Sequence, residues 1–452
     1  MRRARSAFTL SLLALAATTA GCAATPSAAT PSAPAAPAPR NLILMIADGF
    51  GPASATLARE VAGRPLALDA HLVGAISTFA ADTLVTDSAA SATALASGVK
   101  TNNGMVGELP DGTAVRTVLE EAEAHGLATG LVTTSRLSHA TPACFAAHVP
   151  SRGMEQEIAA QMLAQGIEVL LGGGRATFLP RGDGGLRGDG RDLLAEAGAA
   201  GYQVVVDPAG LAAAGPGRVL GLFNDSHMEF EIDRDAQAEP SLAAMTARAL
   251  ELLADDPDGF LLVVEGARID HAAHANDAVS HLSDILAYDA AFAVAAAFAA
   301  ESGDTLLVST ADHETGGLTL GRSIGHEAFY EWRPEVLTGF RASPSAVARA
   351  AEADGEATRV LRELAGDPDL TDGERAELDT AAADGKTARF YNVLVPAVDR
   401  LARVAWTTTG HTGVDVLVYA LGPGAERFRG HRDNTEIGRT VADLFGFELS
   451  AP

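Results

Sequence analysis

Short apolar runs that alternate with longer helical stretches constrain the fold of this chain more than any other feature. Each run is bounded by Gly, Pro or polar residues, which is typical of a buried strand. The runs cover residues 41–47, 127–133, 167–171, 202–206, 260–264, 305–309 and 414–420. Helical stretches lie between several of them, at residues 115–125, 242–254 and 278–300. Because strands that alternate with helices form parallel sheets, the pattern predicts an α/β fold with a large, mostly parallel central sheet and helices on both faces.

One long segment interrupts this alternation. Residues 328–405 contain no clear strand but carry two helix-start signals. Ser343 and Pro344 match a cap and a first helical position, and Thr371 with Glu374 matches a capping box. We predict a helical insertion between two core elements. Three roles stay open for it: a cap over the functional site, an oligomer contact or a peripheral decoration.

The N-terminal residues 1–22 have the layout of a bacterial export signal. Basic residues precede an apolar run that ends near Ala17 and is too short to span a bilayer. Small residues before Cys22 resemble a lipobox, so we favour lipidation of Cys22 over cleavage by an ordinary signal peptidase. Residues 23–39 are rich in Ala and Pro and would form a tether. The sequence therefore predicts an exported protein, periplasmic or tethered to a membrane, with one folded domain over residues 40–452.

The charge balance excludes one class of partner. The chain has 33 Lys and Arg against 58 Asp and Glu, which gives a formal net charge of −25. A surface this acidic repels a phosphate backbone, so nucleic acid is not expected to be a main partner. An anionic substrate would need local compensation from metal ions.

Ser88 is the candidate nucleophile. It follows Thr86 and Asp87 and precedes a run of small residues that predicts a helix. A serine at such a helix start can attack a substrate only if something lowers the free energy of its alkoxide. The segment itself supplies no base, so we expect the activator to be a metal held by residues that are distant in the sequence.

Carboxylate and imidazole side chains lie at the ends of several predicted strands or in the loops beside them, where ligands of open α/β sheets bind. Taken singly, each could be a turn residue, a helix cap or a surface group. Taken together, these nitrogen and oxygen ligands suit zinc, and the oxygen-rich subset suits magnesium. The set consists of Asp48, Glu265, Asp270, His274, Asp312, His313 and His411. It exceeds what one ion uses and predicts a site for two or three metals.

These motifs resemble those of the alkaline phosphatase family in order and spacing, over about residues 41–447 apart from the insertion. The matching motifs are Asp48-Gly49, Asp87-Ser88 with Ala89-Ala90-Ser91-Ala92-Thr93-Ala94, His139-Ala140-Thr141-Pro142, Val264-Glu265-Gly266 with Asp270 and His274, Asp312-His313, and Thr409-Gly410-His411-Thr412. The resemblance implies the fold of that family. It also implies a metal-dependent phosphomonoesterase, with two Zn²⁺ and one Mg²⁺ as cofactors and phosphate monoesters as substrates.

By this resemblance the metal ligands divide into three groups. One zinc would be held by Asp270, His274 and His411. The second zinc would be held by Asp48, Asp312 and His313. Asp48 would also reach the magnesium, which Thr141 and Glu265 complete. Arg152 would clamp the phosphate with its planar fork, and Asp87 would orient that arginine.

The implied reaction is a two-step phosphoryl transfer through a phosphoserine at Ser88. Two positions depart from the best-known bacterial pattern, because His139 stands where those enzymes often carry Asp and His271 where they often carry Lys. The metal of the third site therefore stays open. The alternatives are a phosphodiesterase, a sulfatase or a phosphonate hydrolase of the same fold, and an exported metal- or phosphate-binding protein without turnover. A homodimer also stays open.

Overall fold

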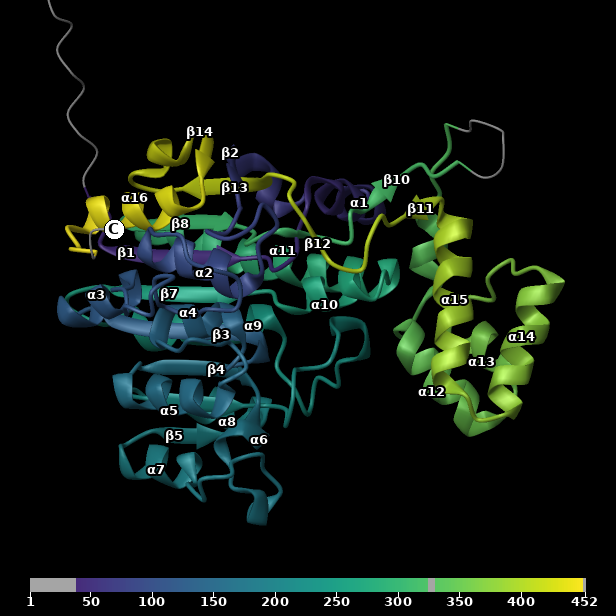
Figure 1. Ribbon diagram of the computed structural model, residues 1–452, viewed down its shortest axis with the longest axis horizontal. Coiled ribbons are helices and arrows are strands. Elements are labelled where there is room, and N and C mark those ends of the chain that lie inside the picture. The colour runs from purple at the N-terminus through teal and green to yellow at the C-terminus, as the bar shows by residue number, and fades with distance from the viewer. Residues whose placement is uncertain (1–37, 324–329, 450–452) are drawn as a thin grey trace, which may run out of the picture. The chain divides into compact units, whose positions relative to one another are not determined.

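The computed structural model describes residues 38–323 and 330–449. The predicted export signal, the predicted lipidation site at Cys22 and nearly all of the predicted tether lie outside the described residues. The body is built on one ten-stranded sheet, coloured from purple to yellow along the chain in Figure 1. In order across the sheet, its strands are β14 (Gly430–Asp433), β2 (Leu72–Ser77), β13 (Val416–Leu421), β8 (Thr305–Thr310), β1 (Asn41–Ile46), β7 (Phe260–Glu265), β3 (Ala128–Arg136), β4 (Val169–Gly173), β6 (Val219–Leu222) and β5 (Gln203–Val205).

The sheet is mostly parallel, as the sequence predicts. Only β13 runs antiparallel to its neighbours β2 and β8, and the other neighbouring strands are parallel. Each of the seven predicted runs overlaps one strand. Three strands of this sheet were not predicted: β2, β6 and β14. They are short or only partly buried, and β14 has the sequence Gly-His-Arg-Asp, so the apolar pattern on which the prediction rests is weak there.

Helices cover both faces of the sheet (Figure 1). Before the insertion they are α1 (Pro52–Ala62), α2 (Ser88–Ser97), α3 (Val118–Ala124), α4 (Ala140–Ala146), α5 (Glu155–Gln165), α6 (Arg175–Phe178), α7 (Leu193–Ala199), α8 (Pro208–Ala213), α9 (Leu242–Leu253), α10 (Arg268–His274) and α11 (Ala278–Ser302), and α16 (Thr435–Phe445) follows it. The three predicted helices correspond to α3, α9 and α11. Helix α2 is buried along its whole length between α4 and α16, which explains why its residues are small.

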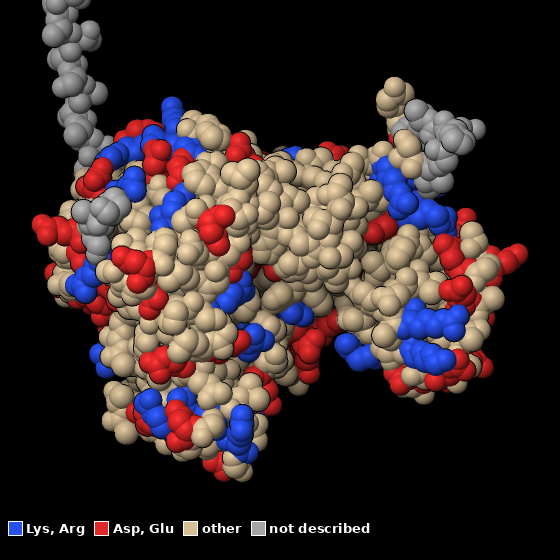
Figure 2. Space-filling view, viewed as in Figure 1, with Lys and Arg blue, Asp and Glu red and all other residues tan. Residues whose placement is uncertain are grey.

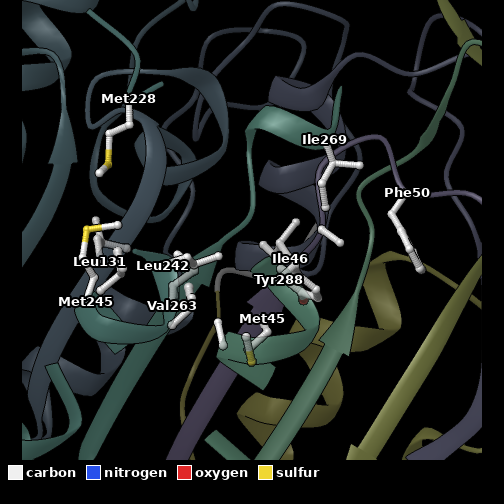
Figure 3. Close-up of a cluster of buried hydrophobic side chains, with 14 of the residues drawn as sticks. Met45, Ile46, Phe50, Leu131, Met228, Leu242, Met245, Val263, Ile269 and Tyr288 are labelled. Atoms are coloured by element: carbon white, nitrogen blue, oxygen red, sulfur yellow. The ribbon is translucent and has the colours of Figure 1, made fainter. Parts of the chain in front are cut away.

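The core lies between the central strands and the helices. Every residue of β1, β7 and β8 is buried. Figure 3 shows Met45 and Ile46 of β1 close to Tyr288 of α11, whose hydroxyl is 2.8 Å from Ser309 Oγ in β8. Burial of each such side chain contributes about 1.5–3 kcal/mol to the free energy of unfolding. The ends of these strands, which carry candidate ligands, are therefore held in place by a well-packed core.

Helix α11 is the one described helix that is long and apolar enough to cross a membrane by length and composition. Half of its most apolar window is buried inside the body. It packs on α9, α10 and β8, so its buried apolar side chains belong to the core.

The predicted insertion is helical. It leaves the body after β10 (Thr319–Leu320) and returns at β11 (Val404–Ala405), which pairs antiparallel with β10. Its helices are a 3₁₀ turn (Pro334–Gly339), α12 (Pro344–Asp354), α13 (Ala357–Leu364), α14 (Asp372–Ala383) and α15 (Thr387–Ala402). The predicted caps are present: Ser343 accepts from the Ala346 N–H, and Thr371 forms a capping box with Glu374.

The insertion lies on the side toward which the parallel strands point (Figure 1). Figure 2 shows acidic and basic side chains mixed over this face of the insertion and the body, so the excess of carboxylates is not gathered into one patch on this face.

Candidate metal centre and active site

Three neighbouring strands bring the candidate ligands to one edge of the sheet. Ile46, at the end of β1, is in register with Glu265 of β7 and with Thr310 of β8. Asp48 and Asp312 follow β1 and β8 by two residues each, so both carboxylates enter the space beside Glu265. This is the carboxyl edge of a parallel sheet, where ligands of α/β folds bind.

Gly49 allows the turn after Asp48 to approach helix α10. Its φ is +75°, and a Cβ at this position would lie 2.8 Å from the Cα of Asp270. A side chain here would therefore be strained and would also displace α10. The Gly49 N–H donates to Asp312 Oδ1 at 3.2 Å, which fixes one oxygen of that carboxylate.

Ser88 is the first residue of helix α2. Asp87 caps this helix by accepting from the Ala90 N–H at 2.9 Å. The Ser88 side chain is 2 % exposed, and its Oγ lies 3.2 Å from His313 Nε2. The hydroxyl thus sits at a helix N-terminus, whose free N–H groups and dipole favour an anion.

One group of ligands consists of Asp48, Asp312 and His313, which are fully buried. His313 Nε2 is 3.1 Å from Asp312 Oδ2 and 3.6 Å from Asp48 Oδ1. Ligand atoms from all three residues lie within 4.8 Å of one another. Three buried ligands this close can hold a divalent cation beside Ser88.

A second group consists of Asp270, His274 and His411. Asp270 and His274 lie on α10, and their Oδ2 and Nε2 atoms are 3.3 Å apart. His411 comes from β12 (His411–Thr412), with Nε2 3.1 Å from His274 Nε2 and 3.8 Å from Asp270 Oδ1. Both histidines donate through Nδ1–H to a backbone carbonyl, of Thr409 for His274 and of Thr86 for His411, and this orients their Nε2 atoms toward the group.

A third group surrounds Glu265. Asp48, His139 and Glu265 offer ligand atoms within 4.8 Å of one another. Thr141, in the first turn of α4, is fully buried, and its hydroxyl acts to lower the pKa of Glu265. Glu265 Oε2 accepts hydrogen bonds from Thr133 and Ser135, so Oε1 is the oxygen left for another partner.

The structure therefore brings all of the predicted ligands together, but the distances do not separate the two predicted zinc groups completely. His313 also lies within 4.8 Å of Asp270 and His411, and its ring stacks on that of His411 with centroids 3.6 Å apart. His139, one of the two positions that depart from the bacterial pattern, offers a ligand nitrogen to the third group.

Burial and mutual repulsion dominate the electrostatics of these carboxylates. Burial, followed by repulsion from Asp312 and Asp270, raises the pKa of Asp48 well above its usual range. Burial also raises the pKa of Glu265 to about 7, against the hydrogen bond from Thr133. Burial opposes ionisation of Asp312 too, but His313 outweighs it and lowers the pKa of Asp312 to about 2. Several negative charges in a dry site require compensating positive charge.

Arg152 lies at the opening of the site. Its Nη1 donates to Asp87 Oδ2 at 3.0 Å, and its Nη2 is 3.1 Å from His139 Nε2. Its backbone N–H donates to the Gly104 carbonyl at 2.7 Å. The side chain is 29 % exposed, so the fork can still meet an anion from solvent.

His271 lies beside the site, together with a histidine that the sequence did not indicate. The rings of His271 and His227 have centroids 4.4 Å apart, and those of His271 and His139 5.5 Å apart. Arg268 Nη1 is 2.9 Å from His271 Nδ1. Burial, with Arg136 and Arg268 next, lowers the pKa of His227 to about 3, so it is neutral near pH 7. His227 follows β6, and because that strand was not predicted, no pattern placed it at the carboxyl edge.

The unsatisfied polar atoms of the site test whether these residues fit divalent cations. Buried polar atoms are almost always hydrogen-bonded, and each exception needs a reason. Several buried ligand atoms have no hydrogen-bond partner among the described residues: both carboxylate oxygens of Asp48, Oδ2 of Asp312, Oε1 of Glu265, Oγ1 of Thr141 and Nδ1 of His139. They gather in one site and are all metal-ligand atoms, so the donor set fits zinc and magnesium.

Comparison with known proteins agrees with this geometry. The family model described as alkaline phosphatase matches residues 39–446. Alkaline phosphatase 3 of Bacillus subtilis is 36 % identical, with 91 % of this chain and 90 % of that protein covered. The crystal structure of a cold-active alkaline phosphatase from Shewanella sp. superposes with a TM-score of 0.83 at 36 % identity, covering 90 % of this chain and 99 % of that one.

A more distant structure bears on the metals. It is a His-to-Asp variant of the TAB5 alkaline phosphatase with magnesium bound in its M3 site, and it matches with a TM-score of 0.69 at 27 % identity, covering 91 % of this chain and 99 % of that one. Together with the match over most of the sequence, these similarities show that the chain belongs to the alkaline phosphatase family of metal-dependent phosphomonoesterases.

Proposed function

We propose that this chain hydrolyses phosphate monoesters through a phosphoserine at Ser88, in a site that holds two zinc ions and one magnesium ion. The observation that carries the proposal is the position of Ser88 Oγ, 3.2 Å from His313 Nε2, at a helix N-terminus and beside buried carboxylate oxygens that lack hydrogen-bond partners. A hydroxyl in such a place is set up for activation by cations rather than by a side-chain base.

We assign each ion to one of the three groups of ligands. Asp270, His274 and His411 would hold one zinc. Asp48, Asp312 and His313 would hold the second. Asp48, Thr141 and Glu265 would hold magnesium, with His139 beside it. When bound there, the ions supply positive charge that stabilises an alkoxide and the negative charge that develops on the leaving oxygen.

The residues of the chain then perform two displacements at phosphorus. Ser88 Oγ gives up its proton to solvent and forms a bond to phosphorus while the bond to the substrate's alcohol oxygen breaks. The leaving alkoxide keeps that electron pair and takes a proton from water to become the alcohol. A water molecule next attacks phosphorus and the Oγ–P bond breaks. Ser88 Oγ takes up a proton lost by that water, which restores the free serine and releases inorganic phosphate. Arg152 and the N–H groups at the start of α2 hold the phosphate oxygens through both steps.

Replacement of Arg152 by lysine tests the phosphate clamp. We expect kcat/KM to fall by about 10- to 100-fold and inhibition by inorganic phosphate to weaken, because an ammonium cannot grip two oxygens and also hold Asp87. Steady-state kinetics with and without phosphate measure both effects. Arg175→Lys is the matched control, since Arg175 pairs with Asp225 on the surface. Equal kinetics for Arg152→Lys and the wild type would remove Arg152 from the mechanism.

A comparison of ester classes tests the reaction itself. Rates are measured on the phosphate monoester, the phosphate diester and the sulfate ester of one alcohol. The monoester should be hydrolysed fastest. A faster rate on the diester or on the sulfate ester would replace the proposed function by the corresponding alternative.

We also propose that the protein is exported and lipidated at Cys22, on the sequence pattern of residues 1–22. Cys22→Ser should move the protein from the membrane fraction to the soluble fraction of the cell envelope, because the substitution removes the thiol that carries the lipid. Fractionation followed by an activity assay measures this, with Ser27→Ala in the tether as the control. If Cys22→Ser fractionates like the wild type, the lipid anchor is wrong.

A further inference from the structure

Thr315 lies beneath the candidate metal centre, on the short strand β9 (Glu314–Thr315). Its side chain is 1 % exposed. Strand β9 pairs antiparallel with β12, and Thr315 is directly opposite His411 in that pair. Thr315 is also two residues after His313, so it sits between the two predicted zinc groups.

The Thr315 hydroxyl contacts one ligand from each of these groups. Its Oγ1 donates to Asp270 Oδ1 at 2.6 Å and lies 3.2 Å from His313 Nδ1. A hydroxyl has a single proton. That proton is donated to Asp270 Oδ1, so the hydroxyl oxygen must accept from His313. The proton of His313 is therefore on Nδ1.

This arrangement determines which nitrogen of His313 can bind a metal. With Nδ1 protonated, the lone pair of a neutral imidazole is on Nε2. Nε2 is the atom that faces Ser88 Oγ at 3.2 Å and Asp312 Oδ2 at 3.1 Å. The same hydroxyl holds Asp270 Oδ1 in place while Oδ2 faces His274.

We infer that Thr315 is a positioning residue whose single hydroxyl orients one ligand of each zinc site, by fixing the tautomer of His313 and the carboxylate of Asp270. The inference rests on the proposed zinc sites. It predicts that loss of the hydroxyl weakens both sites together, although Thr315 touches neither ion. A buried threonine that only fills space would leave zinc affinity unchanged when replaced by valine, which has nearly the same shape.

The test uses metal-free full-length protein titrated with zinc against a chromophoric chelator. Thr315→Val should lose about 10- to 100-fold in zinc affinity at both sites, the usual effect of removing a hydrogen-bond partner of metal ligands. Thr315→Ser keeps the hydroxyl and should bind zinc within about threefold of the wild type. Thr338→Val, at an exposed threonine of the insertion, is the control.

The outcomes separate this inference from the proposed function. If the wild type binds no zinc, the proposed function fails. If the wild type binds two zinc ions and Thr315→Val binds them equally well, or if Thr315→Ser is as weak as Thr315→Val, the inference is overturned and the proposed function stands. Histidine-selective ¹⁵N NMR of the zinc-loaded wild type gives an answer even if Thr315→Val does not fold. His313, assigned by the loss of its signal in His313→Asn, should carry its proton on Nδ1, and an unprotonated Nδ1 would overturn the inference.

Discussion

Ser88→Ala is expected to lower kcat for phosphate monoesters by about 10³-fold or more while the protein keeps its metals. The loss follows because no other described hydroxyl is in contact with His313 Nε2 at the start of α2. The metals should stay because Asp48, Asp312 and His313 contact one another directly, and Ser88 adds only one contact at the edge of this group. A large loss of turnover without loss of metal separates a nucleophile from a structural serine.

Two measurements check this expectation. Elemental analysis should give the same zinc and magnesium content per chain for Ser88→Ala and the wild type. A labelled monoester, quenched in acid, should label the wild type on serine and leave Ser88→Ala unlabelled. Ser97→Ala is the matched control, because Ser97 is also buried in α2 but bonds only to the Thr93 carbonyl at the far end of the helix. If Ser88→Ala retains turnover within about tenfold of the wild type, the covalent mechanism is wrong.

The central strands could be predicted because burial on both faces leaves an unbroken apolar run. The run at residues 41–47 and the run at 305–309 each became a strand in which every residue is buried. The outer strands have a weaker apolar pattern in the sequence. Leu72 of β2 is half exposed, and β14 has no apolar residue, so hydrogen bonding to a neighbour defines these strands rather than their own pattern.

The convergence of most candidate ligands could be predicted from their places at or beside strand ends, since parallel strands bring their carboxyl ends to one edge of the sheet. The distance between the ligands of one zinc group and those of the other could not be predicted, because it depends on the directions of side chains in loops. His313 stacks on His411 and approaches both groups, which no spacing in the sequence indicates. Thr315 was missed for a related reason: a buried threonine carries no chemical signal until its partners are known.

Removal of the metals is expected to abolish turnover, with a fall of about 10³-fold or more on chelation and recovery when Zn²⁺ and Mg²⁺ are added together. Without cations, Asp48 and Glu265 keep oxygens that have no partner, and burial raises the pKa of both carboxyls. These carboxyls then bind protons in place of the missing cations. A proton on a carboxyl does not supply the positive charge that stabilises the Ser88 alkoxide. Activity measured before and after dialysis against a chelator, with each metal restored singly and jointly, checks this. Full activity in the chelated protein would exclude metal-dependent catalysis.

Because protons and cations compete for the same ligands, metal affinity should fall as the pH falls. Burial raises the pKa of Glu265 to about 7 in the metal-free protein. Below that pH a cation must displace a proton from Glu265 in order to bind, and above that pH the carboxylate is already free of the proton. His313 acts in the same direction, because Asp312 raises its pKa although burial opposes this. His411 adds no proton near neutrality, since burial and then His313 lower its pKa to about 4.

Apparent zinc and magnesium affinity should therefore fall steeply, up to about tenfold per pH unit for each displaced proton, as the pH drops below about 7, and should level off above it. Titrations of the metal-free protein across this range measure the slope. Glu265→Gln is the informative variant, because it cannot take up a proton. Its magnesium affinity should be weak at every pH, and the part of the slope that comes from Glu265 should vanish. A slope unchanged in Glu265→Gln would show that the competing protons reside elsewhere, on Asp48 or His313.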